Sequence, residues 1–128
     1  MRNRLLSLLL LSLYGSMLFA QEPLDINDVE RVPLGDFTYQ WRNIYDRTPL
    51  HGKCRIILSY RSYTIAHFNK DGILDGLYEK YEDNHLVQKL TYVKGILRGK
   101  GYEYYTDGTV KKECVWNEQG KIDGLMIE

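Results

Sequence analysis

Apolar and polar residues alternate along residues 37–45, where Phe37, Tyr39 and Trp41 are each followed by a polar side chain. This period of two is the pattern of a β-strand with one buried face. Further strand-like runs follow as far as residue 116, and glycine or aspartate bounds them. Alanine, the strongest helix former, occurs beyond residue 20 only at Ala66. The pattern predicts an all-β protein.

Two short turn sequences separate pairs of these strand-like runs. Asp107-Gly108 is a strong two-residue turn sequence, because both central positions of a type I′ turn need positive φ. Asp83-Asn84 is the same turn with Asn in place of Gly, and Asn tolerates the left-handed region. Each turn predicts a β-hairpin with a definite register. The expected cross-strand pairs are Tyr105–Val110, Glu103–Lys112, Tyr81–Leu86 and Glu79–Gln88.

Glycines recur in a frame of about two dozen residues, which is the sign of an internal repeat. The first set, at nearly equal spacing, is Gly52, Gly76, Gly99 and Gly124. A second glycine precedes three of them at a nearly fixed distance, at Gly72, Gly95 and Gly120. We expect copies at 50–73, 74–96 and 97–121 and a partial copy at 122–128. Each copy forms one hairpin, and the hairpins stack in sequence order as a twisted antiparallel meander with at least one exposed face.

The order of an aromatic pair, an Asp-Gly or Asn turn, a charged strand and a Gly-x-x-x-Gly connector resembles the bacterial variant of the MORN repeat. The matching residues are Tyr81, Asp83, Tyr92, Gly95 and Gly99 in one copy, and Tyr105, Asp107, Gly108, Trp116, Gly120 and Gly124 in the next. The first copy matches mainly through Gly72 and Gly76. The resemblance covers residues 50–128 and implies hairpin arrays that serve as interaction or scaffolding surfaces, with no common enzymatic activity. Some bacterial relatives are named antitoxin-like, and that role would need a cytoplasmic pool of the protein.

Residues 1–20 have the anatomy of a secretory signal peptide. Arg2 and Arg4 precede an apolar run that is short for a transmembrane span, and Ala20 suits the residue before a cleavage site. We expect export to the periplasm or beyond the cell, with no integral membrane span in the mature form. Retention of this segment as an N-terminal anchor is the alternative. Residues 21–36 contain two prolines and several acids and are expected to form a flexible leader before a repeat domain at 37–128.

The charge of the mature chain is nearly balanced. Loss of Arg2 and Arg4 reduces the 17 basic residues to 15 against 17 acidic ones, a formal charge of −2. The charges are interspersed, without the basic patch that nucleic-acid binding or an anionic membrane surface requires. We therefore expect no nucleic-acid partner.

The sequence predicts neither a disulfide, nor a metal site, nor a catalytic centre. The hairpin register places Cys54 and Cys114 five strands apart, roughly 24 Å at the usual strand spacing, which is beyond disulfide reach. They are expected to be buried thiols. His51, His67 and His85 lack the paired spacing of zinc ligands. No nucleophile elbow or phosphate-binding glycine pattern occurs, so we expect no cofactor and no enzymatic activity.

Tyrosine is unusually abundant, with 11 copies, and the predicted register suggests an interaction face. Tyr78, Tyr102 and Tyr104 are expected to share the sheet face opposite Tyr81 and Tyr105. Tyrosines that merely pack between neighbouring strands are the alternative to an exposed aromatic ladder. The leading hypothesis is a non-enzymatic interaction or scaffolding module of the bacterial envelope, whose partner is a protein or a glycan. A self-associating structural protein that pairs through exposed strand edges is the second hypothesis.

Overall fold

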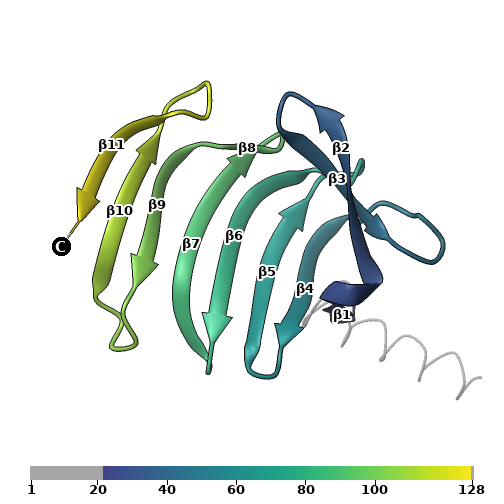
Figure 1. Cartoon of the computed structure of the whole chain (residues 1–128), viewed down its shortest axis with the longest axis horizontal. Coiled ribbons are helices and arrows are strands. Elements are labelled where there is room, and N and C mark those ends of the chain that lie inside the picture. The colour runs from purple at the N-terminus through teal and green to yellow at the C-terminus, as the bar shows by residue number, and fades with distance from the viewer. Residues whose placement is uncertain (1–21, 128) are drawn as a thin grey trace, which may run out of the picture.

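The computed structural model describes residues 22–127, so the predicted signal peptide lies outside the described part of the chain. Within that part, nine strands form one sheet (Figure 1). Eight of them follow the order β1-β4-β5-β6-β7-β9-β10-β11, and β8 pairs with β7. All neighbours are antiparallel except β1 (Leu24–Asp25), which runs parallel to β4. No helix among these residues has the length and hydropathy to cross a membrane.

Three consecutive hairpins make up most of this sheet. The first is β4 (Gly52–Ser59) with β5 (Ser62–Phe68), the second is β6 (Leu74–Glu82) with β7 (His85–Val93), and the third is β9 (Gly99–Tyr104) with β10 (Val110–Trp116). The two-residue strand β8 (Ile96–Leu97) pairs with the end of β7, and β11 (Ile122–Ile127) continues the sheet beyond β10. The predicted antiparallel meander of stacked hairpins is therefore confirmed.

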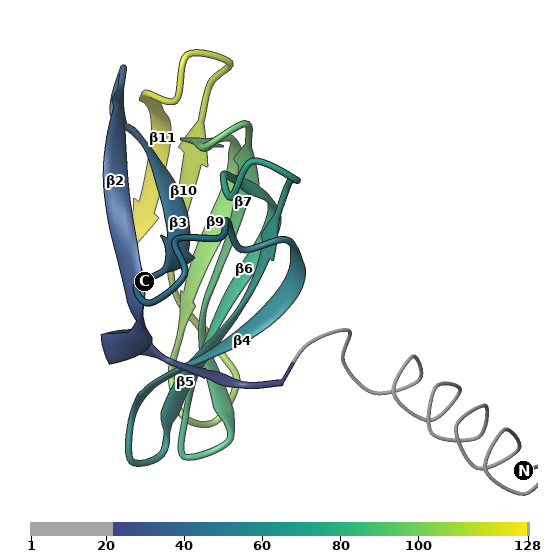
Figure 2. The same ribbon diagram turned by 90° about the vertical axis from the view of Figure 1, so that its right-hand side faces the viewer.

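A second, smaller layer lies on one face of this sheet. After the single-turn 3-10 helix η1 (Ile26–Asp28), the chain forms β2 (Val29–Gly35) and β3 (Thr38–Asn43), which pair as a separate two-stranded sheet. Figure 2 shows this hairpin standing apart from the main sheet. The strand expected at 37–45 is confirmed, but the flexible leader at 21–36 is wrong for 24–35. Its Pro33 lies opposite Tyr39 in a two-stranded ribbon, a setting in which a strand tolerates proline.

The hydrophobic core lies between the β2–β3 hairpin and the first half of the main sheet. Its buried members are Leu50, Cys54, Ile56, Ala66, Phe68 and Leu74. Trp41 of β3 packs on Phe68 of β5, with the ring centroids 5.5 Å apart. The Trp41 amide also donates to the Gly72 carbonyl oxygen over 2.7 Å, and the Trp41 carbonyl accepts from Leu50 over 3.0 Å. Side-chain packing and backbone bonds together hold the two layers in one arrangement.

The Asp83-Asn84 turn forms as predicted, with φ of 49° and 65° at its two residues. Tyr81 faces Leu86, which is also as predicted. The register then shifts between Lys80 and Tyr81, so that Glu79 faces Lys89 and not Gln88. The expected Glu79–Gln88 pair is wrong because a bulge adds one residue to β7, and a single extra residue exchanges the two faces of a strand.

The Asp107-Gly108 turn has a different geometry from the one predicted. The Gly108 amide donates to the Tyr105 carbonyl and the Tyr105 amide to the Thr109 carbonyl, each over 2.9 Å, and Gly108 has a φ of 91°. These bonds describe a three-residue loop in which only the final glycine is left-handed. Val110 therefore faces Tyr104, and the expected Tyr105–Val110 pair is wrong. The Glu103–Lys112 pair is confirmed, because a bulge restores the register.

The two cysteines lie where the hairpin register placed them. Cys54 is on β4 and Cys114 on β10, five steps apart in the strand order, and both are buried. Burial raises the pKa of the Cys54 thiol. Both side chains serve as small apolar groups on the same face of the sheet.

Candidate functional site

The structure does not bring the three predicted interface tyrosines together. Tyr78 faces Leu90 and lies on the sheet face that the β2–β3 hairpin covers. Tyr102 faces Lys89, and Lys89 faces Glu79, the residue that follows Tyr78. Because successive residues of a strand point to opposite faces, Tyr102 lies on the face opposite to Tyr78. The predicted common face is therefore wrong for Tyr78.

The prediction fails because the repeat is not strictly periodic. The step from Gly76 to Gly99 is one position shorter than the step from Gly52 to Gly76, so the counterpart of Tyr78 in the next copy is Gly101 and not Tyr102. A shift of one residue moves a side chain to the other face of a strand. Tyr102 thus occupies the position of Glu79.

Tyr78 is a packing residue of the core. Its ring meets that of Tyr92 edge to face at 6.0 Å, and its hydroxyl hydrogen bonds with the buried Thr64. Burial raises the pKa of Tyr78 and also that of Tyr92. Tyr78 therefore packs between neighbouring strands and is not part of an exposed aromatic ladder.

Tyr102 and Tyr104 do lie close together on the other face of the sheet. Their rings stack with centroids 5.9 Å apart at an interplanar angle of 24°. On the same face, Tyr63 stacks on Tyr81 at 5.0 Å. Burial, followed by the neighbouring Tyr102, raises the pKa of Tyr104. This face, which no described element covers, carries two separate tyrosine pairs.

The repeat glycines lie at turns or strand starts. Those with positive φ are Gly52, Gly72, Gly76, Gly95, Gly99, Gly108 and Gly120, and Gly124 is the exception within β11. Gly72 and Gly120 close loops of the same type as Gly108. Their backbone amides donate hydrogen bonds to the carbonyls of Asn69 and Asn117, respectively. The glycines therefore build the frame of the sheet and form no binding site themselves.

A cleft of about 500 Å³ opens between the β2–β3 hairpin and the main sheet. We call it the hairpin cleft. Its lining residues are Arg31, Asp36, Phe37, Tyr39, Trp41, Leu74, Tyr92, Gly95, Ile96, Leu97, Gln119, Gly120 and Lys121. Four segments thus meet here, namely the hairpin, the start of β6, the β7–β8 region and the β10–β11 turn.

Two glycine turns let these segments approach one another. A Cβ at Gly95 would lie 3.0 Å from the Thr38 side chain at the start of β3. A Cβ at Gly120 would lie 2.3 Å from Cγ2 of Ile96. Such contacts leave no room for a larger residue, so the repeat's turn glycines position the cleft as well as the sheet. In Figure 1 these turns and the hairpin tip lie along the upper end of the sheet.

The hairpin cleft combines aromatic rings with groups of both charges. The Arg31 guanidinium lies 5.8 Å from the centroid of the Tyr39 ring and 5.4 Å from that of Trp41. This cation–π arrangement holds a charged donor in a fixed position at the cleft wall. Phe37, at the hairpin tip, is 97% exposed, and Tyr39 is 43% exposed. Asp36, Gln119 and Lys121 supply further hydrogen-bonding groups at the rim.

A smaller cavity of about 220 Å³ adjoins the cleft and shares Leu97 with it. It lies over β7, β9 and β10, where Trp116 rests on Gly101. A Cβ at Gly101 would be 2.4 Å from Cζ3 of Trp116, so the missing side chain makes room for the indole. The covered face of the first half therefore continues into an open aromatic surface in the second half.

The sequence carries only part of the signal for this cleft. The alternation of Phe37, Tyr39 and Trp41 predicts a strand, but its partner at 29–35 falls within the expected leader. The missed signal is the pairing of 29–35 with the strand that holds Tyr39 and Trp41, because this pairing sets Arg31 opposite Trp41 and so beside both rings. Among residues 22–127, no three His, Cys, Asp or Glu side chains gather closely enough to hold a metal ion.

Comparison with known proteins identifies no family. No protein-family model matches the sequence, and no curated protein matches it. Solved structures that align include a crystal structure of TarM, at 13% identity, and a mutant of S. aureus TarM in complex with Fondaparinux, alpha-GlcNAc-glycerol and UDP, at 14%. Each alignment covers 80% of this chain and 20% of the other, with a TM-score of 0.42. A likeness this weak carries no argument about function.

Proposed function

We propose that this chain is a non-enzymatic binding module of the bacterial envelope and that its hairpin cleft takes a glycan. The observation that carries the proposal is the composition of the cleft, in which exposed rings stand beside hydrogen-bonding groups of both charges. Concave sites with apolar walls and a few placed polar groups are the usual form of ligand sites in proteins.

A sugar ring matches both halves of this lining. One face of the ring presents C–H groups, which pack on the negative face of an aromatic ring, and its edge carries hydroxyls that donate and accept hydrogen bonds. Phe37 and Tyr39 offer the exposed ring surfaces, while Arg31, Gln119 and Lys121 offer donors. Asp36 offers an acceptor at the hairpin tip.

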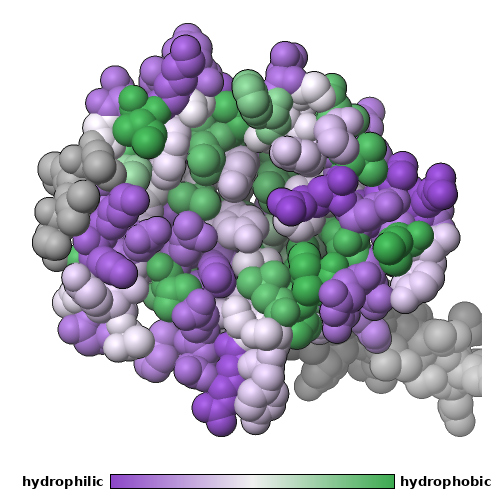
Figure 3. All heavy atoms as spheres, viewed as in Figure 1, coloured by the Kyte–Doolittle hydropathy of each residue, from purple (hydrophilic) through white to green (hydrophobic). Residues whose placement is uncertain are grey.

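The distribution of apolar groups also favours a glycan over a large protein partner. Figure 3 shows the apolar residues of this face in several separate patches, with pale and polar residues between them. Stable protein interfaces centre on a well-packed and largely desolvated group of anchors. A mixed surface with half-exposed rings suits a ligand that brings its own hydroxyls.

The assignment to the envelope is part of the proposal and depends on residues 1–20. Their basic start, apolar run and Ala20 have the pattern of a signal peptide. Fractionation of cells that express a C-terminally tagged chain tests it. Processed protein outside the cytoplasm is the expected result, and a full-length cytoplasmic protein would contradict export and favour the antitoxin-like role.

A printed array of bacterial envelope glycans tests the cleft, with Trp41 fluorescence in a Trp116→Phe background as the second readout. The expected result is retention on at least one glycan class and a saturable change in emission. Tyr39→Ala should weaken binding about fivefold or more, if a sugar gains at least the roughly 1 kcal/mol that a nucleobase gains by stacking on an aromatic ring. Circular dichroism establishes that the variant still folds.

Tyr60→Ala is the matched control. Tyr60 is 85% exposed at the β4–β5 turn, at the other end of the sheet, and Arg61 lies over its ring at 5.3 Å, much as Arg31 lies over Tyr39. Its binding should equal that of the unaltered chain. Equal losses in both variants, or no glycan retained on the array, would overturn the proposal.

Edge-to-edge association of copies is a second candidate, favoured by one observation. Strand β11 pairs with β10 on one side, and no described strand occupies its other side. Exposed edges of this kind can pair with another chain. Light scattering during size-exclusion chromatography decides the matter, because a monomer at all concentrations removes this candidate and a concentration-dependent dimer supports it.

A further inference from the structure

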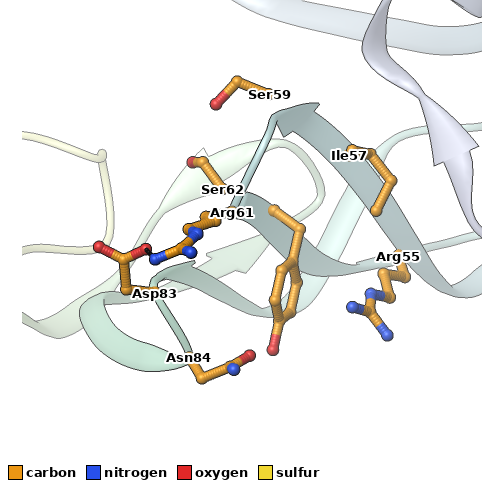
Figure 4. Close-up of a pocket in the computed structure, with 8 residues that line it drawn as sticks. Arg55, Ile57, Ser59, Arg61, Ser62, Asp83 and Asn84 are labelled. Carbon is orange, nitrogen blue, oxygen red and sulfur yellow. Dashed lines mark hydrogen bonds and ion pairs between the residues drawn. The ribbon is translucent and has the colours of Figure 1, made fainter.

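A second pocket lies at the opposite end of the sheet from the hairpin cleft and on its other face. It occupies about 500 Å³ where the β4–β5 and β6–β7 turns come side by side. The Asp83 amide donates to the Arg61 carbonyl over 2.9 Å and joins the two turns. Figure 4 shows Arg61 beside Asp83 at one end of the pocket and Arg55 at the other, below Ile57.

Arg55 is the group of this pocket on which a binding role would depend. Its guanidinium carbon lies 4.1 Å from the centroid of the Tyr63 ring, and Tyr63 in turn stacks on Tyr81 at 5.0 Å with an interplanar angle of 14°. Three successive strands thus supply one stack of a cation and two rings. The stack fixes the guanidinium in place before any ligand arrives, which lowers the entropic cost of binding.

The charge of Arg55 has no counter-ion within residues 22–127, since none of the ion pairs found there includes it. The Arg55 Nε atom is shielded from solvent and makes no hydrogen bond with any of these described residues. A guanidinium held by ring contacts alone keeps its capacity to bind an anion.

The other charges that line the pocket nearly cancel. Arg61 and Asp83 form an ion pair at 3.5 Å, which leaves Arg55 as the one uncompensated charge of the three. A single negative charge on the ligand restores neutrality, whereas the second charge of a dianion would enter the pocket without a cation to pair with. Ile57 and Tyr63 form apolar walls, and Ser59, Ser62 and Asn84 offer hydrogen bonds.

We propose that this pocket binds a monocarboxylate whose acid group is attached to an apolar or planar body. The carboxylate accepts hydrogen bonds from the Arg55 guanidinium, and the body packs against Tyr63 and Ile57. The pocket is separate from the hairpin cleft in position and in chemistry, so its occupancy does not depend on glycan binding.

Three probes that share one ring test the proposal: benzoate, benzamide and phenylphosphonate. Nuclear magnetic resonance titration of the full chain follows the Arg55 side-chain NH and the Tyr63 ring. Benzoate should shift both signals saturably, and neutral benzamide should leave them unchanged. Phenylphosphonate in its dianionic form should bind more weakly than benzoate. No saturable shift with benzoate, an equal shift with benzamide, or tighter binding of the phosphonate would overturn the proposal.

Two substitutions of Arg55 locate the interaction. Arg55→Gln should reduce benzoate affinity at least about tenfold, since hydrogen bonds to charged groups are strong. Arg55→Lys keeps the charge, and its benzoate affinity should lie between those of the unaltered chain and Arg55→Gln, because an ammonium lacks the planar fork that matches a carboxylate. Lys111→Gln is the matched control, since Lys111 also lies over a tyrosine, Tyr105, at 5.9 Å but outside the pocket. Loss of benzoate binding in the control, or full retention in Arg55→Gln, would contradict the assignment to Arg55.

Discussion

In the first half of the main sheet, the face beneath the β2–β3 hairpin holds side chains that are almost fully buried, with Cys54, Ile56 and Ala66 no more than 1% exposed. In the second half, the same face carries Leu90 and Trp116, which stay partly exposed because no described element covers them. Both halves come from one hairpin repeat. The repeat therefore builds the sheet, whereas the β2–β3 hairpin that precedes it determines where a core forms and where a surface stays open.

Truncation of a large apolar residue should therefore cost much more in the covered half. Ile56→Ala should lower the free energy of unfolding by about 3–4 kcal/mol, because it leaves a cavity in a closed core. Leu90→Ala should cost about 1–2 kcal/mol, since solvent already reaches that region. Urea unfolding followed by circular dichroism gives both values. Equal losses would mean that the hairpin does not create the difference between the halves.

The contact between hairpin and sheet can be broken at one glycine. A Cβ at Gly72 would lie 2.5 Å from the Trp41 carbonyl oxygen, whereas one at Gly108 would meet nothing within 4 Å. Both residues have positive φ, so both alanine variants carry the same backbone strain of about 1 kcal/mol. Gly72→Ala should lose about 2–4 kcal/mol in all, because the backbone of β3 must also move. Chemical denaturation that ranks Gly108→Ala as the more damaging change would contradict this contact.

In the open half, Gly101 gives the sharpest test of the Trp116 surface. Gly101→Ala should displace the indole and lower stability by about 1–3 kcal/mol, because the added methyl overlaps its ring. The emission of Trp116, measured in a Trp41→Phe background, should shift. Gly124→Ala, whose Cβ would come no closer than 3.9 Å to Val115, should change stability by less than about 0.5 kcal/mol. An unchanged spectrum in Gly101→Ala would show that the indole lies elsewhere.

The smallest effect is expected at the Asp107 turn, which is exposed and far from the hairpin. Thr109 donates to the Asp107 carboxylate from its hydroxyl over 2.6 Å and from its amide over 2.9 Å, and these bonds hold the pKa of Asp107 below its usual range. A depressed pKa means that the unfolded state binds more protons as the pH falls. The stabilising effect of the charge is therefore present above about pH 4 and is lost as the pH drops through the folded pKa.

Asp107→Asn removes that dependence and leaves the turn itself intact. The difference in unfolding free energy between the two proteins should be small at neutral pH and should vanish in acid. Unfolding at several pH values provides the measurement. A difference that grows as the pH falls would contradict the assignment of this pKa shift to Thr109.

The sequence was sufficient for the parts of the fold that are set locally. The glycine frame and the Asp83-Asn84 turn predict hairpins because each depends on backbone conformations that few residues adopt. Face assignments were less secure. The step from Gly76 to Gly99 is a single position shorter than the one before it, and this was enough to move Tyr102 to the opposite face from Tyr78.

The hairpin cleft lay beyond sequence reasoning for a different reason. Its walls come from Arg31, Tyr92 and Lys121, among others, which are far apart along the chain and belong to no common motif. Arg55 is a similar case, because its position over Tyr63 requires the strand pairing and not only the composition. Local patterns predict the elements, and the docking of one element on another then creates the sites.

The most direct test of the account uses the two indole NH resonances of the chain, which belong to Trp41 in the hairpin cleft and Trp116 beside it. Titration with a glycan that the array retains should shift the Trp41 resonance together with the backbone amides of Arg31, Tyr39 and Gln119. The amides around Tyr63 and Tyr81, on the opposite face, should stay in place. Shifts confined to that opposite face would contradict the claim that the hairpin and the open half of the sheet form the binding site.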